Sequence, residues 1–117
     1  PSTACLVKHK LGIKNTCPAL DIAAVCSGFI YGLSLASELI KGGSYRRVLV
    51  IGSDTFSKIT NWESRDCVFF GDGAGAAVVE ASDDPDALFD SRLYSDTQET
   101  DNFTVYPDDP FAGATAG

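Results

Sequence analysis

The chain has 117 residues, of which 44% are hydrophobic and 21% are charged, and its formal net charge is −7. This balance is typical of a domain that buries a core, and the sequence has no apolar run long enough to span a membrane. Residues 1–79 carry eight Lys or Arg against six Asp or Glu, whereas residues 80–117 carry one Arg against ten acidic side chains. Because the first part is only weakly basic, we expect no nucleic-acid partner.

The chain begins with the signals of a helix. Pro1 is followed by Ser2 and Thr3, either of which can cap a helix over residues 4–11 that ends at Gly12. Residues 13–18 are then predicted to form a loop.

The next segment combines an apolar run with a helical pattern. Residues 19–25 suit a strand that is buried on both faces. Residues 26–41 predict a helix, and Gly28, Gly32 and Ala36 recur along it every four residues. Since glycine inside a helix is locally unfavourable, this stripe indicates that another backbone packs very close and that the helix is fully buried.

Further strands are expected in the second half of the chain. Residues 46–52 read as a parallel strand, so that strand, helix and strand form a right-handed βαβ unit of an α/β architecture. Residues 67–70 and 76–80 are predicted strands, joined by a tight turn at the glycine-rich residues 71–75. One more strand is expected at residues 91–95.

Cys26 is the strongest candidate for a catalytic residue. It lies where the apolar run changes into the predicted helix. A thiol there is close to the first backbone N–H groups of the helix, which stabilise a thiolate and can hydrogen-bond an oxyanion. The alternative is an inert cysteine in the core, since free cysteines are commonly buried.

The other cysteines and the single histidine do not indicate a metal site. Cys5, Cys17 and Cys67 have no CxxC spacing with Cys26 or with one another, and His9 is the only histidine. This pattern lacks the spacing of zinc ligands. We expect free thiols in a reducing cytoplasm.

Trp62 and Arg65 lie three residues apart in a polar segment. An indole and a guanidinium can stack on a nucleobase or contact a phosphate. An ordinary surface loop explains the same spacing.

Four segments, in order, resemble the β-ketoacyl-acyl-carrier-protein synthase III family, the initiating condensing enzymes of bacterial-type fatty acid synthesis. They are PSTACLVKHKLG (1–12), DIAAVCSGFIYGLS (21–34), RVLVIGSD (47–54) and FGDGAGAAV (70–78). The resemblance runs from Pro1 to about Ser82. It implies the thiolase-type fold, in which two similar α/β halves form five alternating α-β-α-β-α layers, present here only in part.

The resemblance also implies roles for individual residues. Cys26 falls on the nucleophile, which takes an acyl group from acyl-CoA and passes it to the carbanion formed when malonyl-acyl-carrier protein loses CO₂. Arg65 falls on an arginine that contacts the nucleotide end of CoA, Phe70 falls on a wall of the acyl pocket, and Trp62 lies at the same rim. No cofactor is expected. Family members are typically homodimers.

The resemblance sets limits as well. The histidine and asparagine with which the family promotes decarboxylation have no matching segment in this chain, which looks like the middle of an enzyme well over twice its length. Residues 1–82 would form the core of the N-terminal half, and residues 83–117 an acidic connecting segment. The alternatives are a related acyl transferase or polyketide-starter synthase, and a non-catalytic α/β binding module in which Cys26 is structural.

Overall fold

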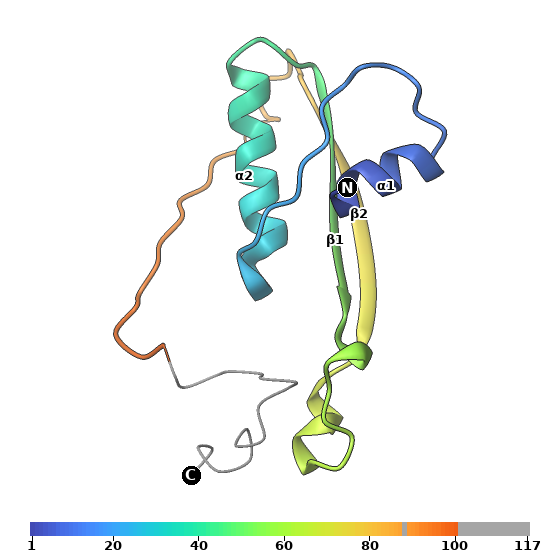
Figure 1. The fold of residues 1–117 in the computed structure, drawn as a ribbon. Coiled ribbons are helices and arrows are strands. Elements are labelled where there is room, and N and C mark those ends of the chain that lie inside the picture. The colour runs from blue at the N-terminus through green and yellow to red at the C-terminus, as the bar shows by residue number, and fades with distance from the viewer. Residues whose placement is uncertain (88, 101–117) are drawn as a thin grey trace.

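The computed structural model describes residues 1–87 and 89–100. Its helices are α1 (Thr3–Lys10) and α2 (Gly28–Lys41), its strands are β1 (Arg47–Thr55) and β2 (Asp72–Glu80), and three short 3₁₀ turns lie at Val25–Ser27, Phe56–Lys58 and Arg65–Phe69. Figure 1 shows α2 alongside a long hairpin made by the two strands, with α1 near the same hairpin.

The first helix follows its sequence signals. The hydroxyl of Ser2 accepts a hydrogen bond from the backbone N–H of Cys5, and this capping satisfies a donor that the helix itself leaves unpaired. After Leu11 the backbone turns at Gly12, whose φ is +70°. The predicted helix over residues 4–11 and the loop that follows it are confirmed.

The segment before α2 differs from the prediction. Residues 13–24 hold no helix or strand, and Val25 begins a 3₁₀ turn. The predicted strand at 19–25 is therefore wrong for the described chain, because a strand needs a neighbouring ladder and none of the described strands pairs with this run. The predicted βαβ unit consequently does not form.

The two strands are antiparallel. Their register runs from Arg47 opposite Glu80 to Thr55 opposite Asp72, with Gly52 opposite Gly75 near the middle. The prediction of a parallel strand at 46–52 was thus wrong in direction. The predicted turn at 71–75 was also wrong, because these residues pair with the end of β1 and form the first part of β2.

Two further strand predictions are corrected. Residues 67–70 fall largely in the 3₁₀ turn Arg65–Phe69. Residues 91–95 form no strand, and instead Ser91 donates a hydrogen bond from its hydroxyl to that of Ser34 on α2, at 2.7 Å. The division of the chain at residue 82 stays a prediction, and residues 101–117 lie outside the described part.

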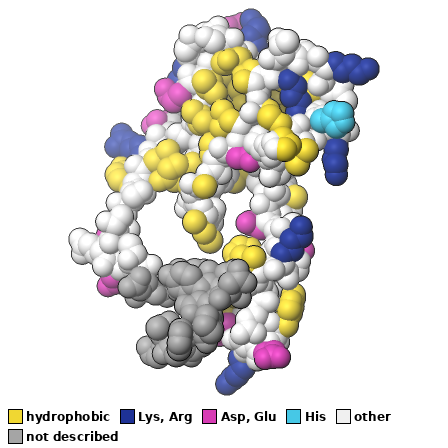
Figure 2. All heavy atoms as spheres, in the orientation of Figure 1, with side chains coloured by type: hydrophobic (Ala, Val, Ile, Leu, Met, Phe, Trp, Pro, Cys, Tyr) yellow, Lys and Arg dark blue, Asp and Glu magenta, His cyan; other side chains and the backbone are white. Residues whose placement is uncertain are grey.

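The core is small and lies between α2 and β1. Ala36 is 1% exposed and Val50 is 8% exposed, while α2 buries only Gly32, Ala36 and Ser37 among its residues. The expectation of a fully buried α2 is therefore wrong for this chain. Figure 2 shows hydrophobic side chains at the surface over the half of the molecule where α2 and the hairpin lie, and Ile30, Leu35, Leu49 and Val78 are among those exposed.

Candidate functional site

Cys26 lies in the 3₁₀ turn that leads directly into α2. The turn is closed by the backbone N–H of Ser27, which donates to the carbonyl of Ala24 at 3.0 Å, and α2 begins at Gly28. The thiol of Cys26 is free and the residue is exposed. Cys26 was predicted to lie between a strand and a helix, and the structure confirms the helix that follows it but not the strand before it.

Val25, the residue before Cys26, has an unusual backbone conformation. Its φ is +47°, and among the described residues it is the one non-glycine residue with a positive φ. A β-branched residue is a genuine outlier in this region. Such strain is typical of functional sites, where the surroundings hold a residue in a sparsely populated conformation.

The packing of α2 on β1 fixes the helix that carries Cys26 at its start. A β carbon built on Gly32 would lie 2.8 Å from Cγ1 of Val50, and one built on Gly52 would lie 3.2 Å from Cδ2 of Phe29. The close approach expected from the glycine stripe is therefore real at Gly32, where a side chain rather than a backbone makes the contact. Gly28 has nothing within 4 Å of a built β carbon, so the stripe does not extend to it.

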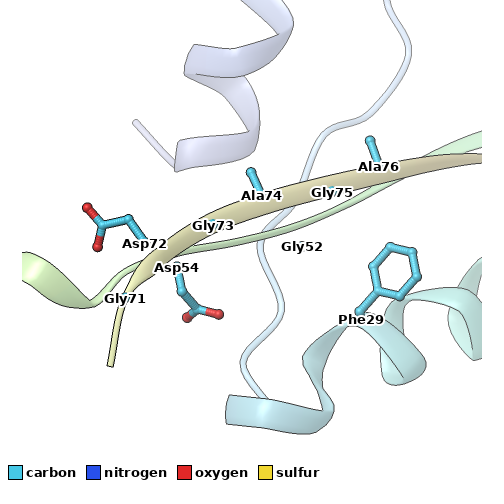
Figure 3. A pocket seen from close by; sticks show the side chains of 9 residues that line it. All are labelled: Phe29, Gly52, Asp54, Gly71, Asp72, Gly73, Ala74, Gly75 and Ala76. Atoms are coloured by element: carbon cyan, nitrogen blue, oxygen red, sulfur yellow. The ribbon is translucent and has the colours of Figure 1, made fainter. Parts of the chain in front are cut away.

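An open hollow lies between the first turn of α2 and the hairpin. Its volume is about 720 Å³, and it is lined by Phe29, Gly52, Asp54 and residues 71–76. Figure 3 shows the Phe29 ring pointing from α2 towards the strands, with the Asp54 carboxylate further along on the same side of the strands and the Asp72 carboxylate on the opposite side. Cys26 is not among the lining residues.

The other predicted site residues lie in the loop between the two strands, residues 56–71. Phe70 stacks on Phe56 with ring centroids 5.1 Å apart and planes at 5°. Arg65 begins a 3₁₀ turn and is exposed, and the indole of Trp62 is 62% exposed. Both are therefore accessible to a ligand.

The base of this loop is held by Asp72. Its carboxylate accepts hydrogen bonds from the hydroxyl of Ser57 at 2.6 Å and from the backbone N–H of Ser57 at 2.8 Å. The hydroxyl, more than the backbone N–H, holds the pKa of Asp72 below its usual value of 3.8. The loop with Trp62 and Arg65 thus starts and ends at a fixed point.

The N-terminal end of α2 and the loop between the strands lie towards the same end of the hairpin (Figure 1). In the described part of the chain, however, no hydrogen bond joins Cys26 to Trp62 or Arg65. The structure therefore does not join Cys26 to these two predicted residues. Sequence reasoning missed Val25 and Phe29, because neither a positive φ at valine nor the ring on Gly52 has a sequence signal.

Within 1–87 and 89–100, no group of three or more His, Cys, Asp or Glu side chains could hold a metal ion. No helix in this part of the chain combines the length and apolar character that crossing a membrane requires.

Comparison with known proteins identifies the family. The family model of 3-oxoacyl-[acyl-carrier-protein] synthase III matches residues 20–97, which include Cys26 and the loop. This chain belongs to the synthase III family. Beta-ketoacyl-[acyl-carrier-protein] synthase III of Thiobacillus denitrificans is 57% identical over 97 residues, and that of Neisseria gonorrhoeae is 54% identical over 97 residues. Each alignment covers 82% of this chain and 30% of the relative.

Solved structures of synthase III are similar to this chain in fold as well as in sequence. The enzyme from Aquifex aeolicus superposes with a TM-score of 0.69 at 54% identity, over 72% of this chain and 27% of that one. The enzyme from Thermus thermophilus superposes with a TM-score of 0.65 at 44% identity, over 69% of this chain and 25% of that one. The chain thus carries part of a thiolase-type α/β fold, as predicted, and spans about 30% of the length of its curated synthase III relatives.

Proposed function

We propose that this chain supplies the acyl-accepting nucleophile of a condensing enzyme of fatty acid biosynthesis, and that the nucleophile is Cys26. The observation that carries the proposal is the exposed thiol of Cys26 directly after the strained Val25, at the start of α2. In a synthase III chain, this arrangement presents a sulfur atom to a substrate at the positive end of a helix.

The first step is transfer of an acyl group from acyl-CoA. The sulfur of Cys26 attacks the thioester carbonyl, the bond to the CoA sulfur breaks, and the thiol proton of Cys26 ends on the CoA thiol. The backbone N–H of Cys26 stabilises the oxyanion that forms in between. Covalent catalysis of this kind divides one difficult condensation into two easier reactions.

The second step uses malonyl-acyl-carrier protein. Loss of CO₂ leaves a carbanion that attacks the carbonyl of the Cys26 thioester, and the sulfur of Cys26 leaves, which gives a 3-oxoacyl product on the carrier protein. His9, the single histidine of the chain, is exposed on α1. Because it lies on a different element from Cys26, we assign it no role, and the 117 residues alone are expected not to complete the condensation.

The loop after β1 forms the entrance for CoA in this proposal. Arg65 contacts the nucleotide end of CoA, Trp62 lies at the same rim, and Phe70 lines the acyl pocket. The exposure of Arg65 and Trp62 supports these roles. No cofactor takes part in either step.

The proposal extends to assembly and location. The active enzyme is a homodimer, which agrees with the apolar side chains that the chain leaves exposed. Its compartment is the cytoplasm, where the free cysteines of the described residues remain reduced.

Acylation is tested by intact mass. The full chain is incubated with acetyl-CoA after circular dichroism has established that it is folded, and the acyl adduct is located by peptide mapping. We expect one adduct, on Cys26, that is lost in Cys26→Ala and retained in Cys17→Ala, which removes another exposed thiol. A folded chain without the adduct would favour the non-catalytic binding module.

Condensation is tested in a chimera. Residues 20–97 of this chain replace the aligned segment of the Thiobacillus denitrificans relative, which supplies the rest of the fold. We expect a 3-oxoacyl product from the chimera and none from its Cys26→Ala variant. Product from the purified 117-residue chain alone would contradict the proposal that it cannot complete the reaction.

A further inference from the structure

The run of residues that leads to Cys26 is attached to α1 by side chains rather than by secondary structure. Lys8 donates from Nζ to the carbonyls of Asn15 at 2.7 Å and Cys17 at 2.6 Å. The thiol of Cys5 lies 3.8 Å from the carbonyl oxygen of Ala19. Since residues 13–24 form no helix or strand, these contacts determine the path of the run.

Asp21 makes the last of these attachments before the nucleophile. Its Oδ2 accepts a hydrogen bond from the backbone N–H of Thr3 at 2.9 Å, and its Oδ1 accepts one from that of Ala4 at 2.7 Å. A carboxylate is also favoured by the positive end of the helix dipole. Asp21 therefore joins the N-terminus of α1 to a point five residues before Cys26.

The next residue contacts the other helix. Cδ1 of Ile22 lies 3.6 Å from a β carbon built on Gly32, in the middle of α2. Two adjacent residues thus connect the run to α1 and to α2. The strained backbone of Val25 follows three residues later, and such a conformation persists only where the surroundings over-determine it.

We propose that Asp21 is a positioning residue for Cys26. By fixing the run to α1, its carboxylate limits the paths that residues 22–25 can take and keeps the Cys26 sulfur in the orientation that attacks an acyl thioester. This inference rests on the proposed function of Cys26. It adds a residue that touches neither the substrate nor the sulfur atom.

The test compares two caps of the same helix. Asp21→Asn keeps one acceptor oxygen but turns an amide NH₂ towards a backbone N–H, so it removes one of the two hydrogen bonds and the charge that link the run to α1. Ser2→Ala also removes a cap of α1, the bond to the N–H of Cys5, but leaves that link intact. Asp21→Glu retains the carboxylate, and Asp83→Asn removes the same charge from an exposed site after β2.

Two rates are measured in the full chain. One is acylation of Cys26 by acetyl-CoA over a range of concentrations, and the other is alkylation of each cysteine by iodoacetamide, resolved by peptide mapping. In Asp21→Asn we expect the acylation rate at saturation to fall about tenfold, which is less than the roughly hundredfold loss that a misplacement of 1 Å can cause. The KM should change by less than about twofold, because Asp21 does not bind the substrate.

The controls separate positioning from stability. Ser2→Ala and Asp83→Asn should leave both Cys26 rates unchanged, and Asp21→Glu should recover most of the loss. Alkylation of Cys67, which is partly buried in the turn Arg65–Phe69, should not change in any variant. Equal effects of Asp21→Asn and Ser2→Ala, or a parallel increase in Cys67 alkylation, would overturn the inference and indicate a role in helix stability alone.

The result is also distinguishable from a failure of the proposed function. If the unmodified chain forms no thioester, Cys26 is not an acyl acceptor, and the proposed function fails. Iodoacetamide reacts with a thiol without an acyl-CoA site. The change in the Cys26 alkylation rate caused by Asp21→Asn therefore still tests whether Asp21 positions that thiol. A Cys26 alkylation rate equal to that of the unmodified chain would refute the positioning role.

Discussion

Gly32 of α2 faces Val50 of β1 so closely that a β carbon on Gly32 would lie 2.8 Å from Cγ1 of Val50. Val50 is buried and β-branched, so its methyl group cannot rotate away freely. Overpacking of this kind costs about 1–3 kcal/mol, whereas alanine gains up to about 1 kcal/mol over glycine inside a helix. Gly32→Ala should therefore lower the free energy of unfolding by about 1–2 kcal/mol in a urea titration.

Gly28→Ala is the matched control for this substitution. Gly28 begins the same helix, but a β carbon built on it meets nothing within 4 Å. The gain in helix propensity is then unopposed, and we expect the free energy of unfolding to rise by up to about 1 kcal/mol. Similar destabilisation by both substitutions would show that contact with Val50 is not the cause.

The positive φ of Val25 gives a prediction with opposite effects on stability and reactivity. Glycine adopts this conformation without strain, and the Val25 side chain is 83% exposed, so little burial is lost. Val25→Gly should raise the free energy of unfolding by up to about 1–2 kcal/mol, the cost of a left-handed residue. Acylation of Cys26 by acetyl-CoA should become slower, because the freed backbone no longer holds the turn.

Val25→Ala separates the two effects, since alanine removes the branched side chain but keeps the penalty of a β carbon at positive φ. The free energy of unfolding of Val25→Ala in a urea titration, and its rate of acylation, should both be much closer to those of the unmodified chain. If Val25→Gly acylates as fast as the unmodified chain, strain at Val25 has no part in presenting the thiol.

Asp72 makes the attachment of the loop dependent on pH. Its pKa is lowered, chiefly by the hydroxyl of Ser57. A carboxyl group with a lowered pKa stabilises the fold fully above its unfolded pKa, and this stabilisation is lost as the pH falls through the folded pKa. We therefore expect the amide signal of Ser57 in NMR spectra to change only below the usual Asp pKa of 3.8.

Ser57→Ala tests the assignment of this pKa shift. It removes the hydroxyl that lies 2.6 Å from Asp72 and keeps the backbone N–H at 2.8 Å. The pKa of Asp72, followed through its carboxyl carbon, should rise part of the way towards 3.8. No change on removal of the hydroxyl would show that the backbone N–H alone lowers the pKa.

The helices and the position of Cys26 just before α2 could be predicted from the sequence because their signals are local. The Ser2 cap, the helical pattern of residues 26–41 and the place of Cys26 between two patterns each depend on neighbours within a few residues. The synthase III family could also be recognised, since four short segments occur in the family's order.

The strands could not be predicted equally well, because pairing depends on residues far apart in the sequence. The apolar pattern of residues 19–25 suits a strand, but no described strand pairs with it. The glycines of residues 71–75 are typical of a turn, yet they pair with β1, whose own Gly52 lies opposite Gly75. Nor could local sequence reveal that Asp21 reaches back to Thr3 and Ala4, because that contact spans a whole helix and loop.

Arg65 is expected to contribute to the binding of CoA. In the chimera that carries residues 20–97, Arg65→Ala should raise the KM for acetyl-CoA about tenfold, since a hydrogen bond to a charged group contributes roughly 1.5–3 kcal/mol. The rate at saturation and the alkylation of Cys26 should stay the same, because Arg65 does not touch the thiol. Arg46→Ala removes an equal charge beside the other end of the hairpin, where the backbone of Arg46 bonds to Ala81, and it should leave the KM unchanged. An equal rise in KM for both variants would mean that net charge attracts CoA, whereas no rise for Arg65→Ala would exclude this side chain from the CoA entrance.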